Sequence, residues 1–146
     1  MQKDKRRLSA DDQYAVNQCL DALNYSQANI SGYKVGSAIV ALNENGAFGI
    51  FDGCNIELAT SKVWHAEEVA LVKAISAGYR NILKCFVTST GEQQCAACCG
   101  YCMQHLMYAN PDCEIIVVNP DGSVKLRTTV RERNGPLAYL GKGRLD

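Results

Sequence analysis

His65-Ala66-Glu67 and Cys95-Ala96-Ala97-Cys98-Cys99-Gly100-Tyr101-Cys102 are the two stretches around which the rest of this chain can be arranged. One His and one Cys-x-x-Cys pair supply an imidazole and two thiolates, a common ligand set for Zn²⁺. Three protein ligands leave a fourth position open for water, as in catalytic zinc sites. Zinc makes bound water acidic near neutral pH, and Glu67 is placed to move that water's proton. Together the stretches predict a hydrolytic zinc site.

Hydrophobic periodicity places both stretches at the beginning of helices. The expected helices and strands, in order, are a helix over 8–25, strands over 33–42 and 47–52, a helix over 65–78, a strand over 82–89, a helix over 99–109, strands over 114–118 and 123–127, and a short helix over 128–134. This order predicts an α/β fold, a three-layer α/β/α sandwich with a mixed five-stranded sheet. Two helix N-termini would then face one metal ion, and such N-termini favour thiolates and hydroxide.

Local signals support several of these boundaries. Ser9 stands three residues before Asp12, a spacing typical of a helix cap, and Asn43-Glu44-Asn45-Gly46 marks a turn between two strands. The helix over 65–78 is expected to bury residues at helical spacing, namely Val69, Val72 and Ile75, with Leu71 as a further candidate.

Length and composition favour one globular domain. The 146 residues fit a single core over 8–146, preceded by a charged, disordered tail over 1–7. Apolar residues make up 47% and charged residues 21%, which excludes a wholly disordered chain. The 15 basic and 15 acidic residues cancel, which argues against a nucleic-acid partner because such partners require a basic face. A small neutral substrate fits this balance better.

The first residues carry no apolar run, so neither a signal peptide nor a membrane span is expected, and the protein is predicted to be cytoplasmic. In a reducing compartment, the eight cysteines are expected to be metal ligands or buried thiols rather than disulfides. Cys19 and Cys85 are expected in the core.

Four ordered motifs resemble those of the cytidine deaminase family, over about residues 8–145. They are Tyr33-Lys34-Val35-Gly36-Ser37-Ala38 (similar to F-K-V-G-A-A), Gly53-Cys54-Asn55-Ile56-Glu57 (G-C-N-x-E), His65-Ala66-Glu67-Glu68 (H/C-A-E-R/Q) and Cys98-Cys99-Gly100-Tyr101-Cys102-Met103-Gln104-His105-Leu106 (P-C-G-x-C-R-Q-x-L). The resemblance implies zinc-dependent hydrolytic deamination of cytidine, deoxycytidine or a related aminopyrimidine nucleoside. Glu67 would be the catalytic proton shuttle in that reaction.

The resemblance also selects the metal ligands. Two Cys-x-x-Cys pairs overlap, Cys95/Cys98 and Cys99/Cys102, and only the second is followed by the family's Gln and Leu. Zn²⁺ is therefore expected on His65, Cys99 and Cys102, with Cys98 standing where the family has Pro. A structural site made of all four cysteines is the alternative, although four ligands within eight residues close poorly around a tetrahedral ion.

The substrate contacts are likewise implied by resemblance. Tyr33 would line the pocket, the Ala66 backbone would hold the base, and Asn55 and Glu57 would bind the ribose hydroxyls. Without the family motifs, the last two would be interpreted as a polar pair that satisfies backbone groups. Tyr139 resembles a C-terminal aromatic that reaches a neighbouring subunit's pocket, which implies a homo-oligomer, a dimer or tetramer. Simple core packing is its alternative.

Two departures from the family pattern bear on the substrate and the metal. The connecting loop over 58–64 is a residue short and carries Leu58 where the family has Asn. The family's Arg positions hold Glu68 and Met103, which is consistent with a neutral His replacing a third thiolate; Glu68 is expected on a solvated helix face. A deaminase of another amino-heterocycle, a nucleic-acid editing deaminase and a non-enzymatic zinc module are the competing hypotheses.

Overall fold

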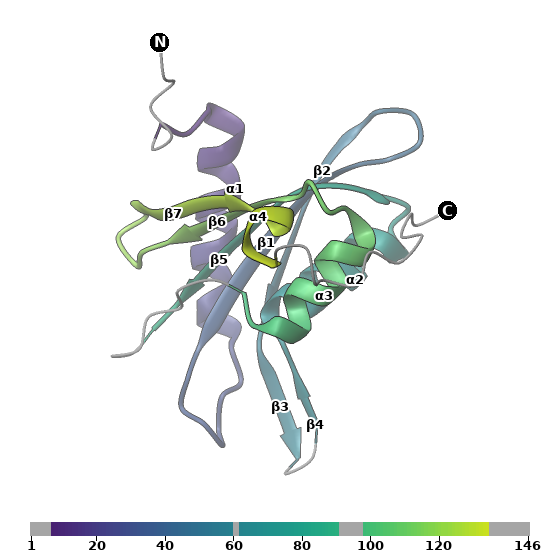
Figure 1. Cartoon of the computed structure of the whole chain (residues 1–146). Coiled ribbons are helices and arrows are strands. Elements are labelled where there is room, and N and C mark those ends of the chain that lie inside the picture. Colours follow the sequence, from purple (N-terminus) through teal and green to yellow (C-terminus); the bar gives the residue numbers. More distant parts are fainter. Residues whose placement is uncertain (1–6, 60–61, 91–97, 135–146) are drawn as a thin grey trace.

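A mixed five-stranded sheet of order β2-β1-β5-β6-β7 lies at the centre of the molecule (Figure 1). The computed structural model describes residues 7–59, 62–90 and 98–134. The strands of this sheet are β1 (Val35–Leu42), β2 (Phe48–Cys54), β5 (Asn81–Ser89), β6 (Glu114–Val118) and β7 (Val124–Thr129). β5 and β6 are parallel, and the other neighbouring pairs are antiparallel. The predicted mixed sheet of five strands is confirmed.

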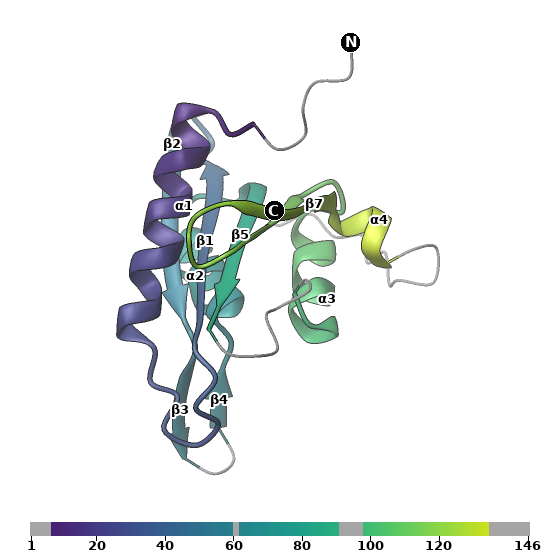
Figure 2. The same ribbon diagram turned by 90° about the vertical axis from the view of Figure 1, so that its left-hand side faces the viewer.

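Helices cover both faces of this sheet (Figure 2). α1 (Ala10–Ala22), continued by a 3₁₀ turn over Leu23–Tyr25, packs on one face. α2 (Ala66–Ser76) and α3 (Gly100–Ala109) pack on the other, and the short α4 (Val130–Asn134) follows β7. The three-layer α/β/α sandwich predicted from the sequence is therefore the observed architecture.

The two cores follow from the alternation of side chains along the strands. In β1, Ala38 and Val40 lie in the core under α1, whereas Ile39 lies in the core under α2 and α3. A strand covered on both faces is expected to be a nearly continuous apolar run, as this one is. Cys19 and Cys85 are both fully buried, as predicted, and the Cys19 thiol donates to the carbonyl of Gly36 at 3.3 Å.

The predicted helix cap at the start of α1 is confirmed. The Ser9 hydroxyl accepts a hydrogen bond from the backbone N–H of Asp12 at 3.1 Å. The buried Asp12 carboxylate points elsewhere, to Lys84 of β5 at 2.6 Å and to Arg127 of β7 at 3.6 Å. These ion pairs attach α1 to the far half of the sheet.

The predicted buried face of α2 is wrong in part. Val72 is 56% exposed, and Val69 and Ile75 are only half-buried. The residues of α2 that are buried are Ala66, Glu67, Ala70, Leu71 and Ala74. Three of these are alanines, and α2 approaches β2 closely, with the backbone of Ala66 and Ala70 next to Gly53. Small side chains thus make up most of the buried face.

The segment expected as a connecting loop over 58–64 is largely a β-hairpin. β3 (Ile56–Ala59) pairs antiparallel with β4 (Lys62–Trp64), and the pair forms its own two-stranded sheet. In both ribbon views the hairpin projects beyond the main sheet (Figures 1 and 2). It delivers the chain directly to the beginning of α2.

Several sequence expectations lie outside the described residues. They concern most of the N-terminal tail over 1–7, Cys95 and Tyr139. Within the described segments, none of the helices combines the length and apolarity that crossing a bilayer would require.

Gly53 allows the closest approach between β2 and α2. A Cβ atom at this position would lie 2.4 Å from the carbonyl oxygen of Ala66 and 2.6 Å from the nitrogen of Ala70. Both are backbone atoms of the first turns of α2, so a side chain at residue 53 must displace the helix itself. The position of the helix that follows His65 thus depends on the absence of a side chain in β2.

We expect Gly53→Ala to lower the free energy of unfolding by about 1–3 kcal/mol, since overpacking against backbone forces a shift. Urea unfolding at a fixed free zinc concentration measures this change. Val72→Ala, on the exposed side of the same helix, is the control and should stay within about 0.5 kcal/mol of the parent. Equal unfolding midpoints for Gly53→Ala and the parent would contradict this account.

Candidate metal centre

The N-termini of α2 and α3 meet, and each begins with a candidate metal ligand. His65 is the N-cap of α2 and Cys99 is the N-cap of α3. Both have extended backbone angles, and neither side chain caps its own helix. The two side chains instead approach one another, with 3.4 Å between Nδ1 of His65 and Sγ of Cys99.

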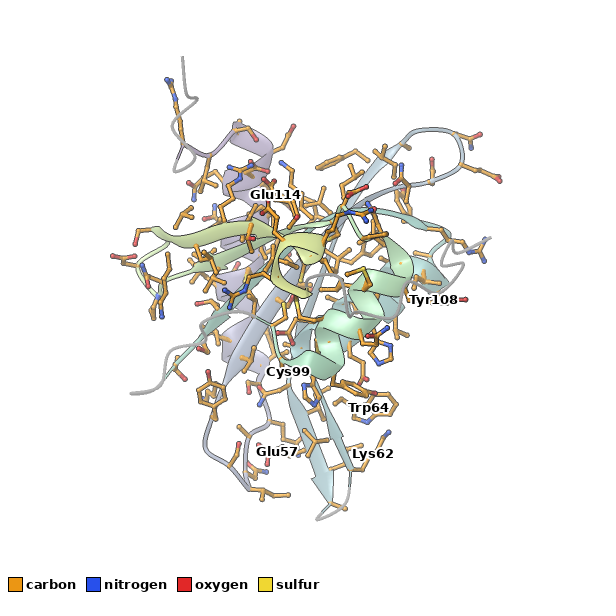
Figure 3. All side chains as sticks on the ribbon, in the orientation of Figure 1. Glu57, Lys62, Trp64, Cys99, Tyr108 and Glu114 are labelled. Atoms are coloured by element: carbon orange, nitrogen blue, oxygen red, sulfur yellow. The ribbon has the colours of Figure 1, made fainter. Side chains whose placement is uncertain are left out.

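Cys102 completes the group from the first turn of α3. One ligand atom each from His65, Cys99 and Cys102 lie within 4.8 Å of one another. Figure 3 shows Cys99 at the end of α3 that is nearest to the β3–β4 hairpin. The sequence therefore identified three side chains that the fold brings together, although 34 residues separate the His from the first of these cysteines.

The electrostatics of this group fit a cation. Burial, the Glu67 carboxylate and Cys99 together raise the pKa of the Cys102 thiol, in that order of importance. Without a cation, ionising a buried thiol beside a carboxylate is unfavourable. One imidazole and two sulfurs are suitable ligands for Zn²⁺, which binds thiols in their deprotonated form. The residues present thus match the requirements of a zinc site.

Glu67 lies beside the ligands without belonging to the group. Its side chain is only 5% exposed, and the Cys102 thiol donates to its Oε2 at 3.5 Å. Because it occupies the first turn of α2, its negative charge also lies at the positive end of the helix dipole. The preceding Ala66 is fully buried. A carboxylate in this position can receive or deliver a proton next to the metal site.

Cys98 lies outside the metal group, and its thiol interacts with Cys85. It is buried, and hydrogen bonding with Cys85 followed by burial raises the pKa of its thiol. Among the described residues, the one cluster suited to a metal ion is His65, Cys99 and Cys102. This arrangement favours the Cys99/Cys102 pair over the alternative in which Cys98 is a ligand.

Asn55 is buried and holds the beginning of β1. Its Oδ1 accepts from the backbone N–H of Val35 at 2.9 Å and from the Ser26 hydroxyl. Its Nδ2 donates to the carbonyl of Tyr33 at 2.6 Å, and the Tyr33 side chain is half-buried. The amide thus fixes both ends of the segment that leads into β1.

Glu57 is also buried and binds the same segment. Its Oε2 accepts from the backbone N–H groups of Ile30 at 3.1 Å and Ser31 at 3.0 Å, and its Oε1 accepts from the Ser31 hydroxyl at 2.5 Å. The side chains of Asn55 and Glu57 therefore face the same side, as strand alternation predicts. Both satisfy backbone groups over 26–35, and their binding of a sugar stays a prediction.

Tyr101 and Glu68 form a contact that the sequence analysis missed. The Tyr101 hydroxyl donates to Oε2 of Glu68 at 2.6 Å, and this bond raises the pKa of Tyr101. The Tyr101 ring lies 5.1 Å from the His65 ring and 4.5 Å, edge-on, from the His105 ring. The expectation of a purely solvated Glu68 is wrong. No local pattern marks this pair, because the two residues lie on different helices.

Comparison with known proteins agrees with this geometry. Residues 9–118 match a family model described as the cytidine and deoxycytidylate deaminase zinc-binding region. The chain belongs to this family. Together with the His/Cys/Cys group, this makes it a zinc-dependent aminohydrolase with Zn²⁺ as its cofactor.

Solved structures of cytidine deaminases are similar along nearly the whole chain. The enzyme from Burkholderia pseudomallei is 27% identical with a TM-score of 0.73, over 90% of this chain and 100% of that one. The enzyme from Mycobacterium tuberculosis is 20% identical with a TM-score of 0.66, over 90% and 98%. The enzyme from Mycobacterium leprae, at 19% and 0.64 over 87% and 98%, shares the same fold.

We expect Cys99→Ala and Cys102→Ala to lose most of their bound zinc, since each removes one of three ligands. Cys98→Ala should keep the zinc content of the parent, because this thiol faces Cys85. Atomic absorption after dialysis against a weak chelator measures the content. Loss of zinc from Cys98→Ala, with retention by Cys102→Ala, would assign the site to the other cysteine pair.

Proposed function

We propose that this chain hydrolytically deaminates cytidine, deoxycytidine or a closely related aminopyrimidine nucleoside, with release of ammonia. One observation carries the proposal: a buried carboxylate, that of Glu67, lies 3.5 Å from a thiol of the His/Cys/Cys group. A structural zinc site needs no such neighbour. The family match and the similarity to cytidine deaminases support the choice of a pyrimidine nucleoside.

In this mechanism His65, Cys99 and Cys102 would hold the zinc. Bound zinc supplies an acidified water that can act as a nucleophile near neutral pH. Glu67 accepts a proton from that water and delivers it to the ring nitrogen beside the amine-bearing carbon. Oxygen then bonds to this carbon, and Glu67 removes the remaining proton from that oxygen and transfers it to the amine as the carbon–oxygen double bond forms. The carbon–nitrogen bond breaks, so that one water is consumed and one ammonia leaves.

Burial of Glu67 supports its role as the proton shuttle. A carboxylate that is 5% exposed exchanges protons with the substrate rather than with bulk solvent. In this proposal the backbone of the adjoining Ala66 would hold the base, and Tyr33 would line the pocket. The proton is then transferred over a short path inside the site.

Sugar recognition is assigned to Asn55 and Glu57. Asn55 donates through Nδ2 to the Tyr33 carbonyl, and an amide nitrogen has a second N–H for a sugar hydroxyl. A carboxylate such as Glu57 accepts at several lone pairs. Because the backbone over 26–35 already holds both side chains, they would meet the sugar without losing side-chain freedom on binding.

One observation favours a specialised substrate as the second candidate. The β3–β4 hairpin stands where the family pattern predicts a loop, and it leads directly into His65. Leu58 and Trp64 of this hairpin are exposed, with Nζ of Lys62 3.8 Å from the centre of the Trp64 ring. An altered rim beside the metal centre can admit another amino-heterocycle, such as a modified nucleoside.

The cellular setting follows from the same proposal. A deaminase of free nucleosides belongs to pyrimidine salvage in the cytoplasm, and a chain with zero formal net charge suits a small substrate better than a nucleic acid. We also propose a homo-oligomer, a dimer or tetramer, in which Tyr139 reaches the site of a neighbouring subunit.

We expect Glu67→Gln to keep its zinc and to lose turnover by about 10²–10⁴-fold, because the amide cannot transfer the proton. Zinc content tests whether the variant keeps its metal, and steady-state ammonia release from the same preparation tests whether it loses turnover. Glu44→Gln, in the exposed turn between β1 and β2, should retain full activity. A fully active Glu67→Gln would exclude the proton-shuttle role.

The substrate is tested by ammonia release from the zinc-loaded protein. The panel holds cytidine, deoxycytidine, substituted cytidines, aminopurine nucleosides and free bases. We expect turnover of cytidine or deoxycytidine. Turnover of another member alone would favour the specialised substrate, and zinc-loaded protein that is inactive on every member would contradict deamination of these compounds.

A further inference from the structure

The orientation of the His65 ring needs an explanation that the metal ligands do not provide. Within the described part of the chain, its hydrogen-bonding partner is Sγ of Cys99, which is itself a candidate ligand. Ligating histidines are normally oriented by a further group, and loss of that group weakens metal binding. The preceding strand β4 is exposed along its whole length, so it does not enclose the ring.

The ring of Tyr101 is the group that lies against His65. The two ring centres are 5.1 Å apart, and the planes are inclined by 38°. Tyr101 stands between Cys99 and Cys102 on α3, so the ring reaches across from the helix that carries the two thiols. We propose that Tyr101 is a positioning residue that orients the His65 imidazole for the metal, an inference that rests on the proposed zinc site.

Glu68 fixes the position of Tyr101. The phenol donates to Oε2 of Glu68 at 2.6 Å, so one end of the side chain is attached to α2 and the other to α3. His105, one turn further along α3, also contacts Tyr101, with its ring edge-on and 4.5 Å between the ring centres. Tyr101 is 53% exposed, so these specific contacts hold it rather than enclosure in the core.

This contact gives the acidic residue at position 68 a function. The family pattern has Arg or Gln there; a guanidinium has no acceptor for a phenol hydrogen bond, whereas an amide oxygen or a carboxylate has one. Glu68 accepts that bond, and the tyrosine in turn supports a neutral imidazole ligand. His65, Glu68 and Tyr101 therefore form one unit that joins the first turns of two helices.

The test measures zinc release from the loaded protein into an excess of a chromogenic chelator. We expect Tyr101→Ala to release zinc about 10–100-fold faster than the parent, the range typical of lost supporting groups. Tyr101→Phe keeps the ring but not the hydrogen bond, so its zinc-release rate should lie between those of the parent and of Tyr101→Ala. Glu68→Gln, whose amide oxygen still accepts, should stay close to the parent, whereas Glu68→Ala should match Tyr101→Phe.

Tyr108→Ala is the matched control. This tyrosine lies on the same helix, towards the end away from Cys99, and is similarly exposed at 46% (Figure 3). Its release rate should equal that of the parent. Equal zinc-release rates for Tyr101→Ala and Tyr108→Ala would overturn the proposal. So would a normally folded Tyr101→Phe that releases zinc as fast as Tyr101→Ala, if Glu68→Ala releases it more slowly than both.

A spectroscopic measurement distinguishes a changed orientation of the His65 imidazole from a general weakening of the metal site. In cobalt-substituted protein, Tyr101→Ala should shift the visible ligand-field bands, whereas Gly53→Ala, which displaces α2 from β2, tests the effect of strain alone. Unchanged bands in Tyr101→Ala would overturn the assignment. Metal release and cobalt spectra need no substrate. They therefore test the role of Tyr101 even if the proposed deamination is wrong.

Discussion

Two helix N-termini must approach closely enough for an imidazole from one and two thiols from the other to reach a common ion. This distance constraint governs much of the fold. The separation of α2 and α3 is set by the strands beneath them, because α2 follows a hairpin next to β2 and α3 follows β5. Glycine in β2 and alanines along α2 bring the first of these helices close to the sheet.

The same arrangement collects groups of like charge. Cys102 and Glu67 are both buried, and the Glu67 carboxylate raises the pKa of the Cys102 thiol and so disfavours its ionisation. A divalent cation reverses this balance, since it stabilises thiolates and the carboxylate together. Metal binding and the stability of this region are therefore linked, and part of the binding free energy serves to stabilise the fold.

Much of the fold and the metal group could be predicted from the sequence. The period of apolar residues predicted the order of helices and strands along the chain. His65 and the Cys-x-x-Cys pair predicted a group of side chains that the fold brings together, because zinc chemistry restricts residue types and spacing. The buried face of α2 could not be predicted in the same way, since hydrophobicity favours Val72 whereas close approach to the sheet selects alanine. The contact between Tyr101 and Glu68 depends on how two helices are placed, which no local pattern encodes.

Asn55 and Glu57 have a consequence for enzyme engineering. Each side chain anchors backbone over 26–35, the segment that leads into β1 at the centre of the sheet. Residues of this kind cannot be exchanged to alter sugar preference without also releasing a stretch of main chain. A raised KM in such a variant would combine a lost contact with a loosened pocket wall. Redesign of selectivity is better directed at the exposed apolar residues of the β3–β4 hairpin, Leu58 and Val63.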